Sequence, residues 1–422
     1  MRLLHSADWH LGARLHEQRR SEDEKHALAQ LVQLTELHAV DAVIIAGDVF
    51  DTANPGAEDM QRYYRTLGAL RDAGVGTVVV IAGNHDSAAR LEAPRTLLEV
   101  FDIHVVGRLE REAPAENAVV ELRGRSGSTV GVCAAVPYLR DGDLRLATAG
   151  ERTDHRAALY ARALGARYAE VVAAARAHSA RRESPLPLVV TGHCYAAGAQ
   201  VGGLERPVQL GGEALVAAGD LAGDADYLAL GHLHRPQAVA GREAWRYAGS
   251  LLPTGFDEAG QTREVVLVDF ETGGGPVQIE RLPLVPYREY RRLAGAVDTV
   301  RSAVEALDPP ADGAPSPWCE VTVRLDGPHP GLARELVELA AARGWALVSV
   351  RRERRDVGGG DDVLATEDLT QLDPEDVFRR LHADEYGGEQ PDDDLLIEFR
   401  RLLEIVTGGR DPGELPDVPA AP

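Results

Sequence analysis

The chain has 422 residues and a formal net charge of −22 at pH 7, with 44% hydrophobic and 27% charged residues. This length exceeds one ordinary core and predicts two or three domains, and the composition is that of a soluble globular protein. The negative net charge argues against a broad basic surface that binds phosphate groups, although the net charge says nothing about how charge is distributed locally.

The N-terminal segment and the cysteines exclude two further classes of protein. The first residues, MRLLHSADWHLGARLHEQRR, hold only a short apolar run, so they lack a secretory h-region and the length of a membrane span. We therefore expect a cytoplasmic protein. Cys133, Cys194 and Cys319 are widely spaced without a C-x-x-C motif, which argues against a disulfide framework or a zinc knuckle.

Apolar runs alternate with helical patterns over the first 270 residues. The runs that predict buried strands are 41–48, 76–86, 128–139, 186–193 and 226–234. Ser21-x-x-Glu24 predicts a capping box that opens a helix, and apolar residues at helical spacing predict further helices around 60–70 and 164–175. This order is typical of an α/β domain with largely buried sheets.

Two smaller parts are expected to follow this domain. The Gly- and Pro-rich stretch 270–290 indicates its exit, so we place the first domain at 1–275. Strand and helix patterns between about 288 and 354 predict a compact α+β module, assigned to 276–355. Two isolated amphipathic helices are expected in 356–410, and the tail 411–422 is expected to be disordered.

Each of the two C-terminal helices carries apolar residues at helical spacing. Asp373-Pro374 predicts the start of the first helix, which carries Val377, Phe378 and Leu381. The second has a stripe formed by Leu395, Leu396, Phe399, Leu402, Leu403 and Val406. Periodicity leaves two interpretations open: the helices dock on their own domain, or the stripe is a docking surface for a partner helix.

Five short polar motifs stand just downstream of apolar runs. They are Asp8-x-His10, Gly47-Asp48, Gly83-Asn84-His85-Asp86, Gly192-His193 and Gly231-His232-Leu233-His234. Because functional side chains in α/β proteins gather where strands end at one edge of a sheet, we expect these residues to converge. The glycines allow a sharp turn and a close approach of another backbone or a phosphate.

The residue types in these motifs suit a pair of divalent metal ions. Taken singly, each residue has an ordinary explanation as a turn former or a buried, hydrogen-bonded histidine. Together, two Asp, one Asn and four His offer oxygen and nitrogen donors without a thiolate, which favours manganese, iron or zinc. With Asp48 bridging, seven side chains fill two sites, and two ions about 4 Å apart activate a water and clamp a phosphate ester.

The order of the motifs resembles that of calcineurin-like metallophosphoesterases over residues 1 to about 270. A finer resemblance, over nearly the whole chain, is to the SbcD family, the nuclease subunits of bacterial SbcCD complexes. The blocks that carry it are LLHSADWHLG, DAVIIAGDVFDT, VVVIAGNHDS, TGHCYAAGA, DYLALGHLHRPQ and YAGSLLPTGFDE. The resemblance implies an α/β fold, a metallophosphoesterase-type β-sandwich flanked by helices, with a small α+β capping domain and C-terminal partner-binding helices.

The resemblance also implies a role for each motif residue. The residues expected to hold one metal ion are Asp8, His10, Asp48 and His234. Those expected to hold the other are Asp48, Asn84, His193 and His232, and the expected metal is Mn²⁺. His85 matches the histidine that contacts the scissile phosphate and protonates the leaving oxygen, and Asp86 would orient it. Asp51 stands where archaeal and eukaryotic relatives have a second histidine, which leaves phosphate positioning by that histidine open.

The implied function is that of a DNA nuclease subunit. The resemblance implies exonuclease action on duplex ends and endonuclease action on single strands or hairpins, in DNA repair, recombination and replication. It also implies a homodimer, with contacts expected near 60–70 and 91–100, and the ATPase SbcC as the partner of the C-terminal helices. The alternative is a stand-alone phosphoesterase for small nucleotides or phosphoproteins, which the net charge of −22 favours and the added helices disfavour.

Three arginines after the first motif are candidates for phosphate contacts. They are Arg14, Arg19 and Arg20. A solvated loop is an equally acceptable explanation for them.

Overall fold

The structure is a computed structural model that describes residues 1–109, 112–144, 153–182, 184–199, 215–271, 276–325 and 329–354. Beyond 354 it describes only 375, 378–379, 382, 390–392 and 395–400. The chain divides into two compact units, Met1–Arg355 and Asp356–Pro422. Among the described residues, no helix is both long and apolar enough to cross a membrane.

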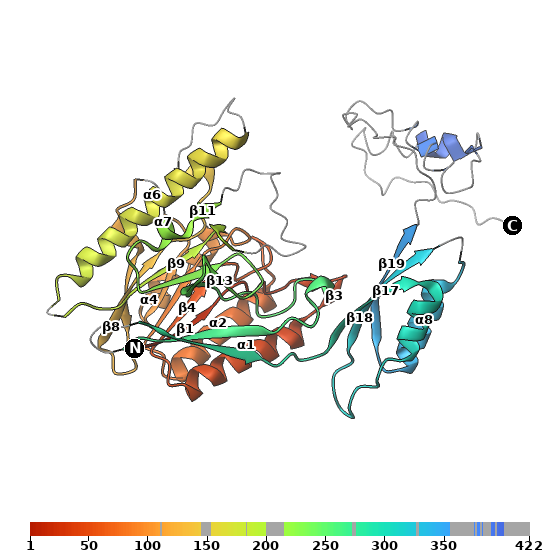
Figure 1. Cartoon of the computed structure of the whole chain (residues 1–422), viewed down its shortest axis with the longest axis horizontal. Coiled ribbons are helices and arrows are strands. Elements are labelled where there is room, and N and C mark those ends of the chain that lie inside the picture. The colour runs from red at the N-terminus through yellow and green to blue at the C-terminus, as the bar shows by residue number, and fades with distance from the viewer. Residues whose placement is uncertain are drawn as a thin grey trace. The chain divides into compact units, whose positions relative to one another are not determined.

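Two six-stranded sheets form the centre of the first unit (Figure 1). The first has the order β16-β15-β1-β4-β5-β6, with bounds Gln278–Leu284, Arg263–Asp269, Arg2–Ser6, Ala42–Ala46, Thr77–Ile81 and Ile103–Val106. The second has the order β13-β14-β12-β9-β8-β7, with bounds Gln237–Val239, Arg242–Tyr247, Tyr227–Gly231, Leu188–His193, Thr129–Ala135 and Val119–Arg123. The five strands predicted from apolar runs are β4, β5, β8, β9 and β12, all in sheet interiors.

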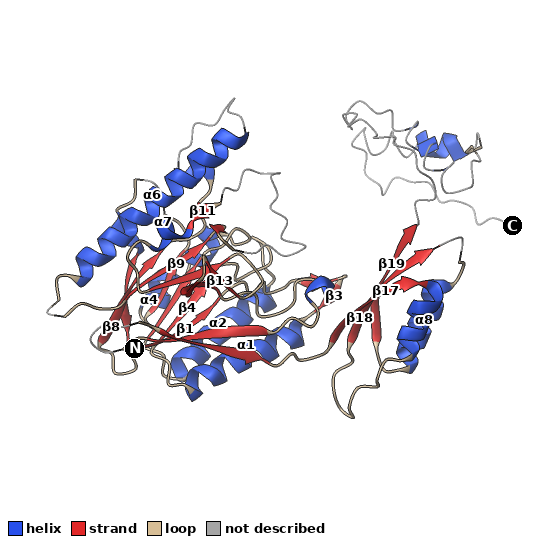
Figure 2. Ribbon diagram, viewed as in Figure 1, coloured by secondary structure: helices blue, strands red, loops and turns tan. Residues whose placement is uncertain are grey.

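The two sheets pack face to face and are covered by helices on their outer faces. Fully buried side chains such as Ile44, Val79 and Val189 fill the space between the sheets. The helices α1 (Ser21–Leu37) and α2 (Ala57–Asp72) cover the first sheet, and α6 (Thr153–Ser179) and α7 (Ala218–Ala222) cover the second (Figure 2). This is the β-sandwich flanked by helices that the sequence predicts.

Short elements complete this part of the unit. The short helices are α3 (Ala88–Glu92), α4 (Arg95–Glu99) and α5 (Asp141–Leu144), with 3₁₀ turns at Ala115–Ala118 and Phe256–Glu258. The two-stranded sheets are β2–β3 (Arg14–Leu15 and Gln18–Arg19) and β10–β11 (Ala196–Ala197 and Val216–Ala217). The hairpin β2–β3 follows the first polar motif directly, so it lies next to the predicted metal site.

The predicted capping box at the start of α1 is wrong. The N-cap is Arg20, and no side chain caps the helix. The carboxylate of Glu24 instead accepts hydrogen bonds from the backbone of Gly12, at 3.1 Å, and from Arg62, at 2.6 Å. The Glu24 side chain, which the local pattern assigned to the helix cap, therefore connects the segment after the first motif to α2.

The stretch 270–290 is more than an exit from the first domain. Its strand β16 pairs antiparallel with β15 along its whole length. Leu282 and Leu284 bury their side chains in the core under α1, which explains why the strand stays on the sheet. The first sheet therefore extends to Leu284, beyond the boundary at 275 expected from the sequence.

A three-stranded parallel sheet follows, which we call the module. Its strands are β17 (Tyr290–Ala296), β18 (Trp318–Leu325) and β19 (Ala346–Arg354), connected by α8 (Val297–Glu305) and α9 (Leu332–Ala342). Both helices pack on one face of the sheet, against Val321 and Val323. The alternation makes the module a βαβαβ unit, whereas an α+β arrangement was expected.

The second unit is described only in part. Residues 395–400 are helical, Leu396 is buried, and the Phe399 ring stacks on Phe378 with ring centroids 4.2 Å apart. Leu395 and Ile397 are exposed. Part of the predicted apolar stripe therefore packs within its own unit. The predicted positions that lie outside the described residues are Asp373, Pro374, Val377, Leu381, Leu402, Leu403, Val406 and the tail 411–422.

A buried histidine between the sheets should make the free energy of unfolding depend on pH. His5 of β1 is fully buried, and its Nδ1 lies 2.9 Å from the hydroxyl oxygen of Tyr227. Burial, and then the charge of Arg246, lowers the pKa of His5 from 6.5 to about 3, so the folded protein keeps this ring neutral. The unfolded chain regains the ordinary pKa and binds one more proton below it.

We therefore expect His5 to lower the free energy of unfolding by about 1.4 kcal/mol for each pH unit as the pH falls from about 6.5 toward 3. Urea titrations at several pH values in this window should show a shallower acid loss for His5→Gln than for the wild type. Equal slopes for the two proteins would contradict the assignment.

Candidate metal centre

The nine predicted site residues come to one edge of the sandwich, where strands of both sheets end. Asp8 and His10 follow β1, Asp48 follows β4, and Asn84, His85 and Asp86 follow β5. From the other sheet, His193 ends β9, and His232 and His234 follow β12. The structure thus brings together side chains that lie up to 226 positions apart in the chain, from Asp8 to His234.

The backbone at this edge adopts conformations that are unfavourable for side chains other than glycine. Asp8, His10, Asp48 and His232 have φ angles of +50°, +43°, +47° and +106°. Each such residue costs on the order of 1 kcal/mol or more, and strain of this kind is typical of functional sites. Position 47 requires glycine, because a Cβ there would lie 2.3 Å from the Nδ1 of His193.

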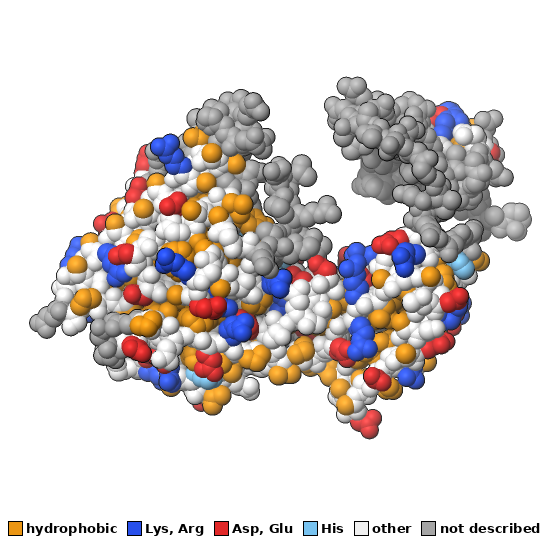
Figure 3. Space-filling model, in the orientation of Figure 1, with side chains coloured by type: hydrophobic (Ala, Val, Ile, Leu, Met, Phe, Trp, Pro, Cys, Tyr) orange, Lys and Arg blue, Asp and Glu red, His pale blue; other side chains and the backbone are white. Residues whose placement is uncertain are grey.

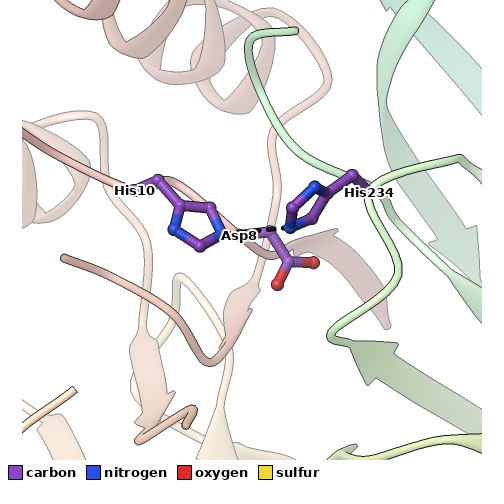
Figure 4. Close-up of side chains that lie close together, drawn as sticks. All are labelled: Asp8, His10 and His234. Carbon is purple, nitrogen blue, oxygen red and sulfur yellow. Dashed lines mark hydrogen bonds between the residues drawn. The ribbon is translucent and has the colours of Figure 1, made fainter. Parts of the chain in front are cut away.

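One cluster of possible metal ligands consists of Asp8, His10 and His234 (Figure 4). Their ligand atoms lie within 4.8 Å of one another. The Nε2 atoms of His10 and His234 face each other at 3.2 Å. The Asp8 carboxylate also accepts the backbone N–H of His232, at 2.9 and 3.1 Å, which joins this cluster to the next.

A second cluster consists of Asp48, His193 and His232. The Oδ2 atom of Asp48 lies 3.3 Å from the Nε2 of His193 and 3.7 Å from the Nε2 of His10. One carboxylate oxygen therefore faces both clusters, as a bridging ligand must. The Oδ1 atom of Asn84 lies 3.0 Å from His193 Nε2 and 2.9 Å from His232 Nδ1, so the amide belongs to the second cluster.

The outer nitrogens of two of these histidines are held by oxygen atoms of the protein. His193 Nδ1 lies 2.9 Å from the carbonyl oxygen of Ala46, and His234 Nδ1 lies 3.0 Å from the hydroxyl of Thr254. A proton on Nδ1 leaves Nε2 as the inward-facing acceptor, which is the tautomer that a metal ion requires. This donor set, with its fixed tautomers, fits two divalent cations.

Burial and charge shift the pKa of several of these groups. Burial, with the charge of Asp48 adding to it, raises the pKa of Asp8 to about 7. Burial alone would raise the pKa of Asp48, but the charges of His193 and His10 hold it well below its usual range. Burial alone would lower the pKa of His193, whereas Asp48 raises it to about 9. Burial, and then the charge of His10, lowers the pKa of His234 to about 2.

Divalent metal binding should therefore release protons and tighten as the pH rises. A pKa of about 9 means that His193 is mostly protonated at neutral pH, and a metal ligand must give up that proton. We expect the Mn²⁺ affinity to rise about tenfold per pH unit for each proton displaced and to level off above about pH 9. Titration calorimetry in two buffers of different ionisation enthalpy measures the proton count, and a count of zero at neutral pH would contradict the expectation.

His85 lies on the exposed side of the centre. Its Nδ1 lies 2.8 Å from the carbonyl oxygen of Asp51, and its ring centroid lies 4.9 Å from that of His10. The family resemblance implies that Asp86 orients this ring, but the contact comes from the Asp51 carbonyl. The buried carboxylate of Asp86 instead accepts the backbone N–H groups of Val49, Phe50 and Gly83 at 2.9 to 3.1 Å. Asp86 therefore fastens the loop after β4 to the loop after β5.

Some neighbours of the centre were not predicted from the sequence. Thr254 contacts His234, and the ring of Tyr195 lies edge-on to that of His232 with centroids 4.1 Å apart. Tyr195 lies two residues after the end of β9, whereas Thr254 lies in the loop between β14 and β15. Both belong to segments quoted above for the family resemblance, and that membership is the only signal that could have found them. Of the three candidate arginines, Arg20 is buried and donates to the carbonyl of Pro253, which removes it as a phosphate contact.

Comparisons with known proteins agree with this geometry. Residues 1–236 match the family described as calcineurin-like phosphoesterase, and residues 286–386 match one described as Type 5 capsule protein repressor C-terminal domain. Because the first match covers more than half of the chain, the chain belongs to the calcineurin-like phosphoesterases.

Its relatives narrow the family further. The chain is 31% identical to the D subunit of the nuclease SbcCD from Escherichia coli strain K12, over 97% of this chain and 99% of the relative. It is 31% identical to the corresponding protein from Bacillus subtilis strain 168, over 97% and 98%, and 33% identical to that of Rhodobacter capsulatus, over 90% and 93%. Within the phosphoesterases, the chain belongs to the SbcD family.

Proposed function

We propose that this chain is a metal-dependent nuclease subunit that hydrolyses phosphodiester bonds of DNA. The observation that carries the proposal is the convergence of two carboxylates, one amide and four imidazoles at one strained edge of a calcineurin-like sandwich. The names of its relatives, which cover nearly the same length, support the choice of nucleic acid as substrate.

The seven ligands would hold two divalent ions, and Mn²⁺ suits their mixture of nitrogen and oxygen donors. Asp8, His10 and His234 would hold one ion, Asn84, His193 and His232 the other, and Asp48 both. When bound, such a pair supplies a water that ionises near neutral pH and positive charge for the phosphate. His85 keeps its Nδ1 on the Asp51 carbonyl, so its Nε2 is the nitrogen that can donate a proton to the leaving oxygen.

The family suggests the wider setting. We propose exonuclease action on duplex ends and endonuclease action on single strands and hairpins, together with the ATPase SbcC, in DNA repair, recombination and replication in the cytoplasm. We propose a phosphoesterase domain up to about 284, the module up to 355 and a partner-binding segment beyond it, a division supported by the end of β16 at Leu284 and by the two compact units. The exposed Leu395 and Ile397 support the C-terminal helices as the SbcC contact.

A homodimer is the proposed quaternary state of this protein. Leu97 and Val100 are exposed to 64% and 76%, and the neighbouring Phe101 to 53%. These three large apolar side chains lie on and just after α4, at or next to the range 91–100 where a dimer contact is expected. An exposed apolar patch of this kind supports contact with a second copy of the chain.

The proposal is tested by the choice of substrate. The purified chain with Mn²⁺ should cleave a labelled hairpin DNA as well as a small diester such as a cyclic dinucleotide. Turnover of the small diester alone would favour the stand-alone phosphoesterase, for which the net charge of −22 is the supporting observation. Turnover of neither substrate would reject both functions.

A further inference from the structure

A cavity beside the metal centre lies between the hairpin β2–β3 and the module. Its volume is about 400 Å³, within the range of small-ligand sites. The residues that matter for its chemistry are Arg14, His16, Thr254, Arg292, Glu320 and Arg351. Thr254 also contacts the Nδ1 of the metal-ligand candidate His234, at 3.0 Å, so the cavity adjoins the metal centre on that side.

Glu320 of β18 is the structural centre of this cavity. Its side chain is only 3% exposed. One of its oxygens lies 2.7 Å from His16 Nε2 and 3.2 Å from Arg351 Nε, and the other lies 3.2 Å from Arg292 Nε. A single buried carboxylate thus gathers basic groups from the hairpin, from β17 and from β19. One of these basic groups is enough to balance the negative charge of Glu320.

The two guanidiniums from the module form ion pairs with Glu320 through Nε, which leaves their terminal nitrogens available. Their side chains are 42% exposed for Arg292 and 57% for Arg351. Within the described part of the chain, neither makes another ion pair or side-chain hydrogen bond. A guanidinium paired through Nε still offers its two terminal nitrogens as a planar fork of donors, which is the geometry that phosphate oxygens accept.

The charge of the cavity contrasts with that of the whole chain. The described side chains on the face shown in Figure 3 mix acidic, basic and apolar groups, and the net charge of the chain is −22. The charged residues that line the cavity include three arginines and two carboxylates, those of Glu320 and Asp257. Arg14 has one further partner, the 90% exposed Glu17 at 3.4 Å, a weak surface pair. The cavity therefore has a local excess of positive charge.

We propose that this cavity binds a phosphodiester group of the substrate strand beyond the bond that is cleaved. Arg292 and Arg351 would contact that phosphate, and Glu320 is a positioning residue that fixes both guanidiniums and ties them to the hairpin through His16. The inference rests on the proposed nuclease function and adds a strand-holding site to it. Because the contact lies away from the reacting bond, it binds the ground state and the transition state alike, and it lowers KM without changing kcat.

The test uses the full chain with Mn²⁺ and two substrates, a labelled single-stranded oligonucleotide and bis(p-nitrophenyl) phosphate, which is too small to span both sites. The double variant Arg292→Ala/Arg351→Ala should raise KM for the oligonucleotide about tenfold and reduce its salt dependence by about one phosphate contact. Turnover of the small diester should stay within about twofold, which also reports a folded metal centre. The control Arg301→Ala/Arg334→Ala removes two arginines from α8 and α9, on the opposite face of the module, and should leave both substrates unchanged.

Glu320→Gln separates positioning from simple charge. This change adds net positive charge, so electrostatics alone predicts a lower KM for the oligonucleotide, whereas loss of positioning predicts a higher one. A KM for the arginine double variant that equals the control's would overturn the proposal. The proposal would also be overturned if the arginine double variant kept its KM for the oligonucleotide and lost only its inhibition by a free mononucleotide. The cavity would then bind a reaction product and not the substrate strand. Failure of the wild type on both substrates would instead reject the proposed function.

Discussion

Replacing Asp48 with alanine is expected to reduce phosphodiester turnover by about 10³-fold or more. The Oδ2 atom of Asp48 faces His193 and His10, so one change removes a ligand from both proposed ion sites. It also removes the acceptor for the backbone N–H of His85, which lies 2.9 Å from Asp48 Oδ1. Assays with a small diester, combined with metal analysis of the same preparation, should show less than one bound ion per chain.

Asp269→Ala is the matched control for this variant. Asp269 ends β15 and pairs with Arg2 on the surface, at 3.1 Å and with 42% of its side chain exposed. Its loss removes the same carboxylate group without touching the centre, so metal content and turnover should stay at the wild-type level. An Asp48→Ala protein that keeps two ions and full turnover would contradict the bridging role.

His85→Ala is expected to reduce turnover by about 10²- to 10⁴-fold while the metal content stays close to that of the wild type. The reason is that His85 lies on the exposed side of the centre, with its Nδ1 committed to the Asp51 carbonyl. A proton donor to the leaving oxygen matters most for poor leaving groups. The loss should therefore be larger for an alkyl diester, such as a dinucleotide, than for bis(p-nitrophenyl) phosphate.

The same variant also decides between two roles for His85. His85, His10 and Asp51 form a third group whose ligand atoms lie within 4.8 Å of one another, which is close enough for a metal ion. Loss of bound metal together with activity would assign His85 to metal binding. Equal losses for good and poor leaving groups would also reject the proton-donor role.

Much of the fold and of the candidate site could be predicted because the relevant signals are local. Strands buried on both faces are continuous apolar runs, as in β4 and β9, and a site in an α/β sandwich is expected where such runs end. A short motif such as Gly47-Asp48 therefore carries both the turn and the ligand. The sequence predicts that the motifs converge at one edge of a sheet, but it does not show that they come from two sheets, because strand order is set by tertiary pairing.

Features set by tertiary contacts could not be predicted in this way. Glu24 matches a helix-capping pattern, but it contacts Gly12 and Arg62. Asp86 lies next to His85 in sequence, yet its carboxylate holds backbone N–H groups of the loop after β4. Glu320 meets His16 from 304 positions away, and no local pattern links the two.

The central claim is that seven side chains hold two divalent ions that share Asp48. The most direct measurement is a crystal structure of the chain grown with Mn²⁺, with anomalous diffraction collected at the manganese edge. The account predicts two anomalous peaks about 4 Å apart, one beside Asp8, His10 and His234 and the other beside Asn84, His193 and His232. A single peak, or peaks bound away from these residues, would contradict it.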